Sequence, residues 1–248
     1  MDHVHAFWED AAPRWDALLA DANAFVNHQE SFRRFHWFLK KSLKIGNRTK
    51  SYRLLDLGCG TGEAAWPLWK KVASVTFCDR SPAMLRAARN KYPKGLFVRG
   101  DAASLPFLDA EFDVIVSRGG ILSQLDPEYV PHALAHLWRV LRPQGHVLFD
   151  FLTDPALWPG PVTAYRTGWK RTEMEALIRR HLPGAVVAAY DGMVGLPGQG
   201  YPLGIITALS ELYLYIYSSV TTGNLQHSYF SNTSRLRFEA SYIVAAGK

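Results

Sequence analysis

The sequence predicts an α/β fold in which a mostly parallel sheet carries helices on both faces. From residue 54 onward, short apolar runs rich in Leu, Val, Ile and Phe alternate with stretches of helical periodicity. Such alternation is typical of βαβ units, whose crossovers are right-handed. In addition, the first apolar run ends in a glycine-rich turn and the second ends in an acid. Both features are expected at the carboxyl ends of strands in a sheet that binds a ligand.

Each element can be placed along the chain from these patterns. The strands are expected at 53–58, 74–79, 95–101, 112–117, 146–152, 184–192 and 237–247, which makes a seven-stranded sheet. The helices between them are expected at 62–71, 82–91, 129–141 and 170–181. A Pro/Gly-rich stretch follows the fifth strand at 154–168, and a segment rich in Gly, Tyr and Ser lies at 193–234.

Residues 1–50 are predicted to be helical. Around residues 32–44 the apolar and basic side chains separate onto two helical faces. The apolar face holds Phe32, Phe35, Leu39 and Leu43, and the other holds Arg33, Trp37, Lys40, Lys41 and Lys44. The basic face is expected to be solvated, and contacts with a membrane surface or with RNA are the alternatives. We expect one domain over 1–248, made of the N-terminal helical segment, a first half at 52–152 and a second half at 153–248 that contains 193–234 as an insertion.

Composition excludes several classes of protein. The chain carries two cysteines, Cys59 and Cys78, which is too few for a disulfide framework or for a four-cysteine zinc site. No apolar run reaches the roughly 18 residues of a membrane span. The first residues lack a basic start followed by an apolar stretch, so we expect no secretory leader and a cytoplasmic location with reduced thiols. The net charge of +6 is compatible with an acidic partner but does not require one.

The first predicted strand runs into a glycine loop with the sequence Asp56-Leu57-Gly58-Cys59-Gly60-Thr61-Gly62. Glycines permit positive φ angles and close approach of a ligand, although such a pattern also occurs in plain tight turns. A dinucleotide fingerprint would need its third glycine at position 63, where this chain has Glu63. A pyrophosphate would sit poorly beside the carboxylates of Asp56 and Glu63, whereas a ligand with a cationic amino-acid end would suit them.

Asp79 ends the second predicted strand, twenty-one residues after Gly58. An acid at this point can accept hydrogen bonds from both hydroxyls of a ribose. The alternative is a solvated turn residue or a helix cap. However, Ser81 and Pro82 supply the cap and the first turn of the next helix, so we expect Asp79 to be free for a ligand.

Five motifs together resemble the class I, Rossmann-like S-adenosylmethionine-dependent methyltransferases. They are LLDLGCGTG, CDRSPAMLRAAR, RGDAASLPF, FDVIVS and LWRVLRPQGHVL, and they cover about residues 52–152. The resemblance is to the type 11 group, which includes the ubiquinone and menaquinone C-methyltransferases. One departure is Gln144, which stands where the family usually has glycine; we expect it to be tolerated because Gly145 remains.

The resemblance implies a set of contacts with S-adenosylmethionine and no metal. The glycine loop, with Asp56 behind it, would hold the methionine part and Asp79 the ribose. Arg80 and Met84 would flank the adenine, Asp101 and the Ala102 backbone would bind it, and Ser117 and Arg118 would lie near the sulfonium. The full cofactor set is Asp56, Gly58, Cys59, Gly60, Gly62, Asp79, Arg80, Met84, Asp101, Ala102, Ser117 and Arg118.

Two aromatic groups are candidates for the acceptor side. The opening segment resembles the N-terminal lid of the family, so Trp8 and Trp15 either face the sulfonium through a cation–π contact or belong to the helix core. The insertion carries Tyr201, Tyr213 and Tyr217, which either border the acceptor pocket or belong to a structural cover or a dimer contact.

The expected function is transfer of a methyl group to a small, aromatic or lipophilic metabolite. An RNA methyltransferase that uses the basic segment 33–53, and a cofactor-binding protein without catalysis, are the alternatives. We expect a small-molecule substrate rather than nucleic acid as the partner. No general base is assigned, because the histidines at 132, 136 and 146 fall in the helix and strand after the site and are expected to be structural or exposed.

Overall fold

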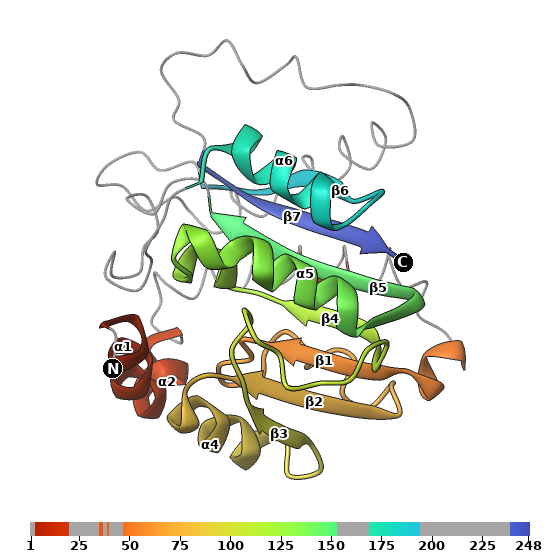
Figure 1. The fold of residues 1–248 in the computed structure, drawn as a ribbon. Coiled ribbons are helices and arrows are strands. Elements are labelled where there is room, and N and C mark those ends of the chain that lie inside the picture. The colour runs from red at the N-terminus through yellow and green to blue at the C-terminus, as the bar shows by residue number, and fades with distance from the viewer. Residues whose placement is uncertain (1–2, 20–34, 37–38, 40–46, 153–168, 194–238) are drawn as a thin grey trace, which may run out of the picture.

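Figure 1 shows the computed structural model of the chain, which describes residues 3–19, 35–36, 39, 47–152, 169–193 and 239–248. The sheet of this part of the chain has the strand order β3-β2-β1-β4-β5-β7-β6. The strands are β1 (Arg53–Leu57), β2 (Ser74–Asp79), β3 (Leu96–Arg99), β4 (Phe112–Ser117), β5 (Leu141–Leu152), β6 (Val186–Met193) and β7 (Glu239–Gly247).

Strands β1 to β5 pair in parallel, and β7 is antiparallel to both of its neighbours, β5 and β6. The predicted α/β class with a mostly parallel sheet is therefore confirmed. The order reverses at β1, so that β2 lies on one side of it and β4 on the other. A ligand of an open α/β sheet binds at the carboxyl ends of the strands around such a point.

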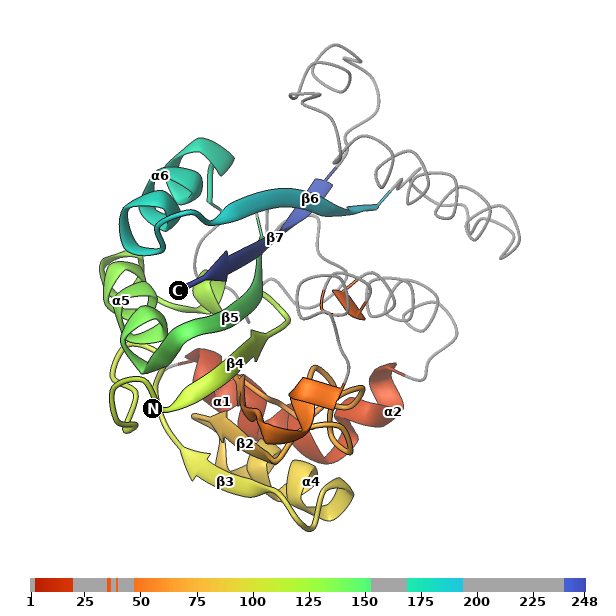
Figure 2. The same cartoon turned by 90° about the vertical axis from the view of Figure 1, so that its right-hand side faces the viewer.

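Helices cover both faces of the sheet. They are α1 (His3–Ala11), α2 (Trp15–Leu19), α4 (Pro82–Lys91), α5 (Val130–Val140) and α6 (Arg171–His181). The helices α5 and α6 lie side by side on one face, and α4 lies on the other (Figure 2). The helical N-terminus begins at α1, and α1 and α2 stand at the edge of the sheet where β1 and β2 end (Figure 1).

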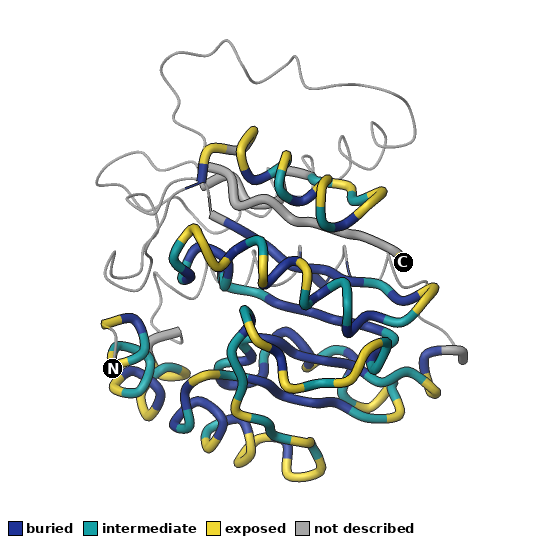
Figure 3. Tube along the Cα trace, in the orientation of Figure 1, coloured by how far each residue is buried: buried dark blue, intermediate teal, exposed yellow. Residues whose placement is uncertain are grey.

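The alternation of side chains along each strand builds two separate cores. Leu55, Ile115 and Val147 pack on the side of α5 and α6. Their neighbours in sequence, Leu54 and Val114, pack with side chains of α4 on the opposite side. Because both faces are covered, β1, β2 and β4 are buried throughout their centres (Figure 3). This explains why they read as continuous apolar runs rather than as alternating ones.

The predicted helix at 62–71 is wrong. The chain forms successive turns there, closed mainly by hydrogen bonds from a residue to the third one before it, as from Trp66 to Glu63 and from Leu68 to Ala65. Pro67 gives the physical reason. It has no N–H to donate to Glu63, and its ring would clash with that carbonyl in an α-helix.

The predicted start of the fifth strand at 146 is five residues late, since β5 begins at Leu141. The extra residues contain Pro143 and the glycine-like position Gln144. Gln144 adopts a left-handed φ of +64°, and its N–H donates to the Lys248 carbonyl. An L side chain in this conformation costs roughly 1–2 kcal/mol, so the turn tolerates Gln144 at an energetic cost.

Among the N-terminal predictions, Phe35 and Leu39 are buried in the core on the α4 face, as their helical spacing predicts. The remaining apolar and basic positions of that helix lie outside the described residues: Phe32, Arg33, Trp37, Lys40, Lys41, Leu43 and Lys44. The insertion 193–234, with Tyr201, Tyr213 and Tyr217, also lies outside them, apart from Met193 at the end of β6.

Candidate active site

The carboxyl ends of β1, β2 and β4 meet at one edge of the sheet and carry the predicted site residues. The loop after β1 holds three glycines with positive φ: Gly58 at +62°, Gly60 at +51° and Gly62 at +92°. These are conformations that other residues adopt at a cost. The glycines therefore shape the loop as predicted, and their surroundings differ.

Gly60 and Gly62 differ in what lies around them. A side-chain carbon added to Gly62 would come closer than 3.0 Å to the Tyr92 ring, so this glycine serves packing. A carbon added to Gly60 would meet nothing within 4 Å. The loop therefore rests on the protein at Gly62 and is open at Gly60, which leaves room for a ligand to approach the backbone.

Asp79 connects the glycine loop to helix α4. One carboxylate oxygen accepts from the Gly60 N–H at 2.9 Å, and the other accepts from the Ser81 N–H at 2.9 Å. Ser81 caps α4 as predicted, since its Oγ accepts from the Met84 N–H at 3.1 Å. Asp79 was expected to be free for a ligand, and the structure shows that two backbone N–H groups already bind it. A carboxylate offers roughly four acceptor positions, and half-buried Asp79 keeps capacity for further donors.

Desolvation by burial raises the pKa of the Asp79 carboxyl, while the backbone N–H groups of Ser81, Gly60 and Arg80 oppose that shift. Desolvation is also the main reason that the pKa of Asp56 lies well above its usual range, and the nearby acids Asp79 and Glu63 add to it. Asp56 is fully buried behind the loop, where one oxygen accepts from the Ala65 N–H at 3.1 Å. Among the residues that the structure describes, its second oxygen has no partner.

The residues predicted around the adenine form a short network. The Arg80 Nε lies 3.3 Å from an Asp101 carboxylate oxygen, and the other Asp101 oxygen accepts from the Ala103 N–H at 2.9 Å. Ala102, which lies between Asp101 and Ala103 in the sequence, is buried. Met84 is also buried, and it packs against Ala12 of the N-terminal segment. The structure thus brings Arg80 and Asp101 together and places Met84 under the N-terminal helices.

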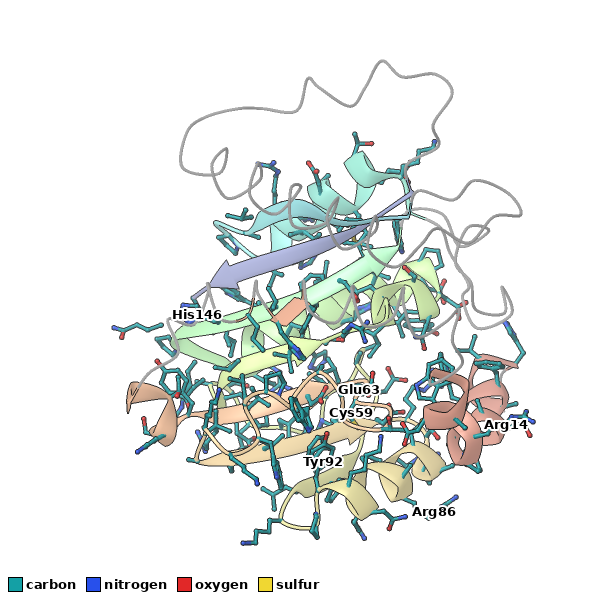
Figure 4. The ribbon with its side chains drawn as sticks, turned by 180° about the vertical axis from the view of Figure 1, so that it is seen from behind. Arg14, Cys59, Glu63, Arg86, Tyr92 and His146 are labelled. Carbon is teal, nitrogen blue, oxygen red and sulfur yellow. The ribbon has the colours of Figure 1, made fainter. Side chains whose placement is uncertain are left out.

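Ser117 and Arg118 follow at the end of β4. Ser117 is buried on the α5 face, and its Oγ has no hydrogen-bond partner in the described part of the chain. The Arg118 guanidinium lies 3.6 Å from the Glu63 carboxylate, so it reaches back to the glycine loop. Figure 4 shows Glu63 and Cys59 close together at this edge of the sheet. Cys59 is buried, and desolvation raises the pKa of its thiol well above the usual range, which makes it a poor nucleophile.

Helices α1 and α2 cover this edge, and we call residues 3–19 the lid. Hydrogen bonds join the lid to three different loops of the site, and Glu9 and Asp16 also accept from the Ala83 N–H at 3.2 Å and the Lys91 ammonium at 2.6 Å on α4. Asp16 accepts from the Thr61 hydroxyl at 2.9 Å, Glu9 accepts from the Ser81 hydroxyl at 2.6 Å, and the Trp8 indole donates to the Gln124 side chain at 2.9 Å.

The lid also contributes apolar contacts. Trp8 and Trp15 meet edge to face with ring centres 5.0 Å apart, and both pack against the small core of Ala12, Ala83 and Met84. The alternative of a core role for these tryptophans is therefore supported, and their half-buried rings still stand at the site.

Four polar residues of this arrangement were missed by the sequence analysis. They are Glu9, Asp16, Gln124 and Asp150. Asp150 had a recognisable signal, because it is an acid inside an apolar strand and is 2% exposed. The other three had none, since each acts through a partner far away in sequence. The histidine at 146 lies at the opposite edge of the sheet from Cys59 (Figure 4), in agreement with a structural role.

Comparisons with known proteins decide the family. A family model described as a methyltransferase domain matches residues 54–145. The malonyl-[acyl-carrier protein] O-methyltransferase of Erwinia pyrifoliae is 31% identical over 80% of this chain and 74% of its own length. The chain belongs to the class I S-adenosylmethionine-dependent methyltransferases. This methyltransferase is also similar to the demethylmenaquinone methyltransferase of Renibacterium salmoninarum, at 27% identity over 80% of the chain and 79% of the relative.

Solved structures support the same fold for this methyltransferase. A SAM-dependent methyltransferase of Thermotoga maritima has a TM-score of 0.60 at 15% identity and covers 99% of both chains. A TehB-like SAM-dependent methyltransferase of Corynebacterium glutamicum has a TM-score of 0.56 at 19% identity over 98% of this chain and 99% of that one. The protein is therefore an enzyme with S-adenosylmethionine as its cofactor, as the motifs predict.

The site residues of the methyltransferase fit this cofactor. The open space in front of Gly60 suits a ligand that approaches the loop backbone. The unpartnered oxygen of Asp56 and the half-buried carboxylate of Asp79 suit donors, such as an ammonium group and ribose hydroxyls. In the described ranges, no group of three or more His, Cys, Asp or Glu side chains forms a metal cluster, and no helix has the length and apolarity to cross a membrane.

Proposed function

We propose that this methyltransferase transfers the methyl group of S-adenosylmethionine to a small aromatic or lipophilic metabolite. The observation that carries the proposal is the pairing of an open glycine loop with a lid that brings Trp8 and Trp15 to the same edge. Aromatic faces attract both a sulfonium and an apolar acceptor. The names of the relatives, which refer to demethylmenaquinone and to malonyl-[acyl-carrier protein], are compatible with more than one acceptor.

The proposed roles follow the position of each side chain. Asp79 accepts from the ribose hydroxyls, and the glycine loop with Asp56 receives the methionine end. Asp101, the Ala102 backbone and Arg80 border the adenine. Ser117 and Arg118 line the passage toward the acceptor. Met84 flanks the adenine with Arg80, and Cys59 belongs to the loop that receives the methionine end; both side chains are buried. Tyr201, Tyr213 and Tyr217 are proposed for the acceptor side on sequence grounds.

The proposed mechanism requires little covalent chemistry from the protein's own side chains. The bound cofactor supplies a methyl group already activated on a cationic sulfur. Asp79 and the Gly60 backbone orient the ligand, and the lid excludes water from the transfer. Holding two reactants in line in this way is worth roughly 7–11 kcal/mol. The raised pKa of the Cys59 thiol keeps it protonated, so the loop offers no competing nucleophile beside the methyl group.

Binding of S-adenosylhomocysteine to an Asp79→Ala variant tests the cofactor site. Because Asp79 would lose its bonds to the ribose, we expect the affinity in calorimetry to fall by about 2–4 kcal/mol. Asp113→Ala is a matched control, since Asp113 also accepts from a backbone N–H, that of Arg53 at 2.7 Å, but lies at the start of β4. Unchanged affinity in folded Asp79→Ala would contradict the assignment.

Methyl transfer from radiolabelled S-adenosylmethionine tests the acceptor class. We expect label in a small hydroquinone or another aromatic acceptor and none in RNA. Label in RNA would favour the alternative based on segment 33–53.

We also propose one domain over 1–248 and a cytoplasmic location; the two thiols, which are free in the structure, support a reducing compartment.

A further inference from the structure

Asp150 is a buried acid on β5 that the cofactor contacts described above do not use. It is 2% exposed, and both of its carboxylate oxygens accept hydrogen bonds from the loop after β4. The Gly119 N–H donates at 3.1 Å and the Gly120 N–H at 2.7 Å. Both glycines have positive φ, +96° and +66°. Two successive N–H groups in such a turn form a concavity that suits an anion, and the Asp150 carboxylate accepts from both of them.

The same loop carries the attachment point of the lid. Gly120 precedes a short 3-10 helix, Ile121–Gln124, and accepts from the Ser123 N–H at 2.9 Å. At the end of this helix, Gln124 donates to the Gly119 carbonyl at 3.2 Å and accepts from the Trp8 indole at 2.9 Å. The Gln124 side chain therefore joins the loop to the lid, and its position depends on the backbone that Asp150 fixes.

We propose that Asp150 is a positioning residue that keeps the lid closed, because it fixes loop 118–124 and that loop holds the lid through Gln124. Strand β5 and the lid then behave as one mechanical unit. This inference rests on the proposed function only in that the closed lid retains the cofactor. When the lid is closed in a smaller fraction of the protein, the apparent affinity for a ligand under the lid is lower.

Cleavage by trypsin after Arg14 measures local opening of the lid, because the backbone of the 3-10 turn Ala12–Arg14 must unfold before a protease can cut it. Arg14 is exposed, pairs with Asp10 and points outward from the lid, away from Glu63 (Figure 4). When opening and closing are fast, the cleavage rate follows the open population. We expect Asp150→Asn to accelerate appearance of the fragment ending at Arg14 about tenfold without ligand, and to weaken S-adenosylhomocysteine binding by a similar factor.

Two further variants separate coupling from general destabilisation. Gln124→Ala removes the half-buried link between the loop and the lid and changes no residue of the hydrophobic core, so it keeps the test valid if Asp150→Asn folds poorly. Asp113→Asn is the matched control, because Asp113 accepts from the Arg53 N–H and the Arg142 guanidinium at the opposite edge of the sheet. We expect the control to leave lid cleavage within about twofold of wild type.

The double variant Asp150→Asn/Gln124→Ala gives the decisive readout. If both residues act on one chain of contacts, the cleavage rate of the double variant should be no higher than that of the faster single variant. If they act independently, the two increases in cleavage rate multiply. Multiplying effects, or a cleavage rate of Asp150→Asn no higher than that of Asp113→Asn, would overturn the proposal.

An NMR signal provides a second, spectroscopic readout. The indole N–H resonance of Trp8, assigned by its loss in Trp8→Phe, reports on the hydrogen bond to Gln124. It should move in Asp150→Asn and stay in place in Asp113→Asn; an unmoved signal contradicts the proposal. Failure of the wild type to bind S-adenosylhomocysteine would count against the proposed function, whereas cleavage and NMR without ligand judge this inference alone.

Discussion

The two edges of the sheet differ in how their polar groups are hydrogen-bonded. At the carboxyl edge, where β1, β2 and β4 end, Asp56 and Ser117 each keep a buried oxygen without a partner among the described residues. At the amino edge, Asp113 joins the Arg53 N–H and the Arg142 guanidinium, and the buried Arg53 Nε lacks a partner among the described residues. There, Lys248 donates to the Trp138 and Leu141 carbonyls at 2.9 and 3.1 Å.

The carboxyl edge combines its unpartnered oxygens with the open space at Gly60, and this combination separates function from stability. Buried polar atoms without partners cost free energy, and they persist in proteins mainly where a ligand uses them. The hydrogen bonds at the amino edge tie β1, β4, β5 and α5 together. Substitutions at the carboxyl edge should therefore change ligand affinity and stability in different ratios, while those at the amino edge should change stability alone.

The largest effect is expected within the glycine loop itself. Gly62→Ala would push a methyl group into Tyr92 and strain a φ of +92°, so the free energy of unfolding should fall by about 3 kcal/mol. Gly60→Ala meets no atom, so it should cost about 1 kcal/mol of stability and yet abolish S-adenosylhomocysteine binding by filling the open space. Denaturant unfolding and calorimetry on both variants compare the two. Equal losses of stability would show that the loop is not divided in this way.

Arg139→Ala tests the amino edge. Arg139 donates to the Leu105 and Phe107 carbonyls at 3.0 and 2.8 Å, and its removal leaves both without this donor. We expect a loss of about 2 kcal/mol in the free energy of unfolding, with unchanged affinity for S-adenosylhomocysteine. A weakened affinity in the folded variant would mean that the two edges are coupled.

Asp56→Asn tests the cost of the buried acid. Because desolvation raises the folded-state pKa of Asp56, the folded protein binds more protons than the unfolded chain between the usual value of 3.8 and the raised pKa. This contribution to stability is present at low pH and is lost as pH rises through that window. We expect the variant to be more stable at pH 8 by about 1–2 kcal/mol, with a flatter dependence of stability on pH and weaker cofactor binding. A destabilised variant at pH 8 would show that the carboxylate is satisfied in a way that the amide is not.

Gln144→Gly should give the smallest effect. The change relieves the left-handed φ of +64° but adds backbone entropy to the unfolded chain, so the net gain in the free energy of unfolding should be about 0.5 kcal/mol. Thermal unfolding measures it, with Gly145→Ala as the opposite case, since a carbon there meets the Leu141 side chain at 2.8 Å. A stability loss in Gln144→Gly would show that its side chain makes a contact worth more than the strain.

The sequence predicted the cofactor half of the fold well. Strand β2, helix α4 and strand β4 have the predicted bounds, because buried runs, a serine–proline cap and a short turn are local signals. The prediction was wrong for 62–71, where Pro67 decides against a helix that the apolar spacing favours. The glycine loop and Asp79 were identified as a ligand site, but the two backbone bonds of Asp79 were not, since they depend on how Gly60 is placed.

By itself, the sequence determined the order of the core elements through spacing along the chain, and the family and the cofactor through five motifs that resemble those of known methyltransferases. The tertiary structure alone decided how the lid is seated. Trp8 and Gln124 are 116 positions apart, and Glu9 and Ser81 are 72 apart. Asp150 holds its loop across 30 positions. The sequence around a polar side chain does not indicate such a distant partner, since the hydrogen bond exists only after the sheet has brought the strand ends together.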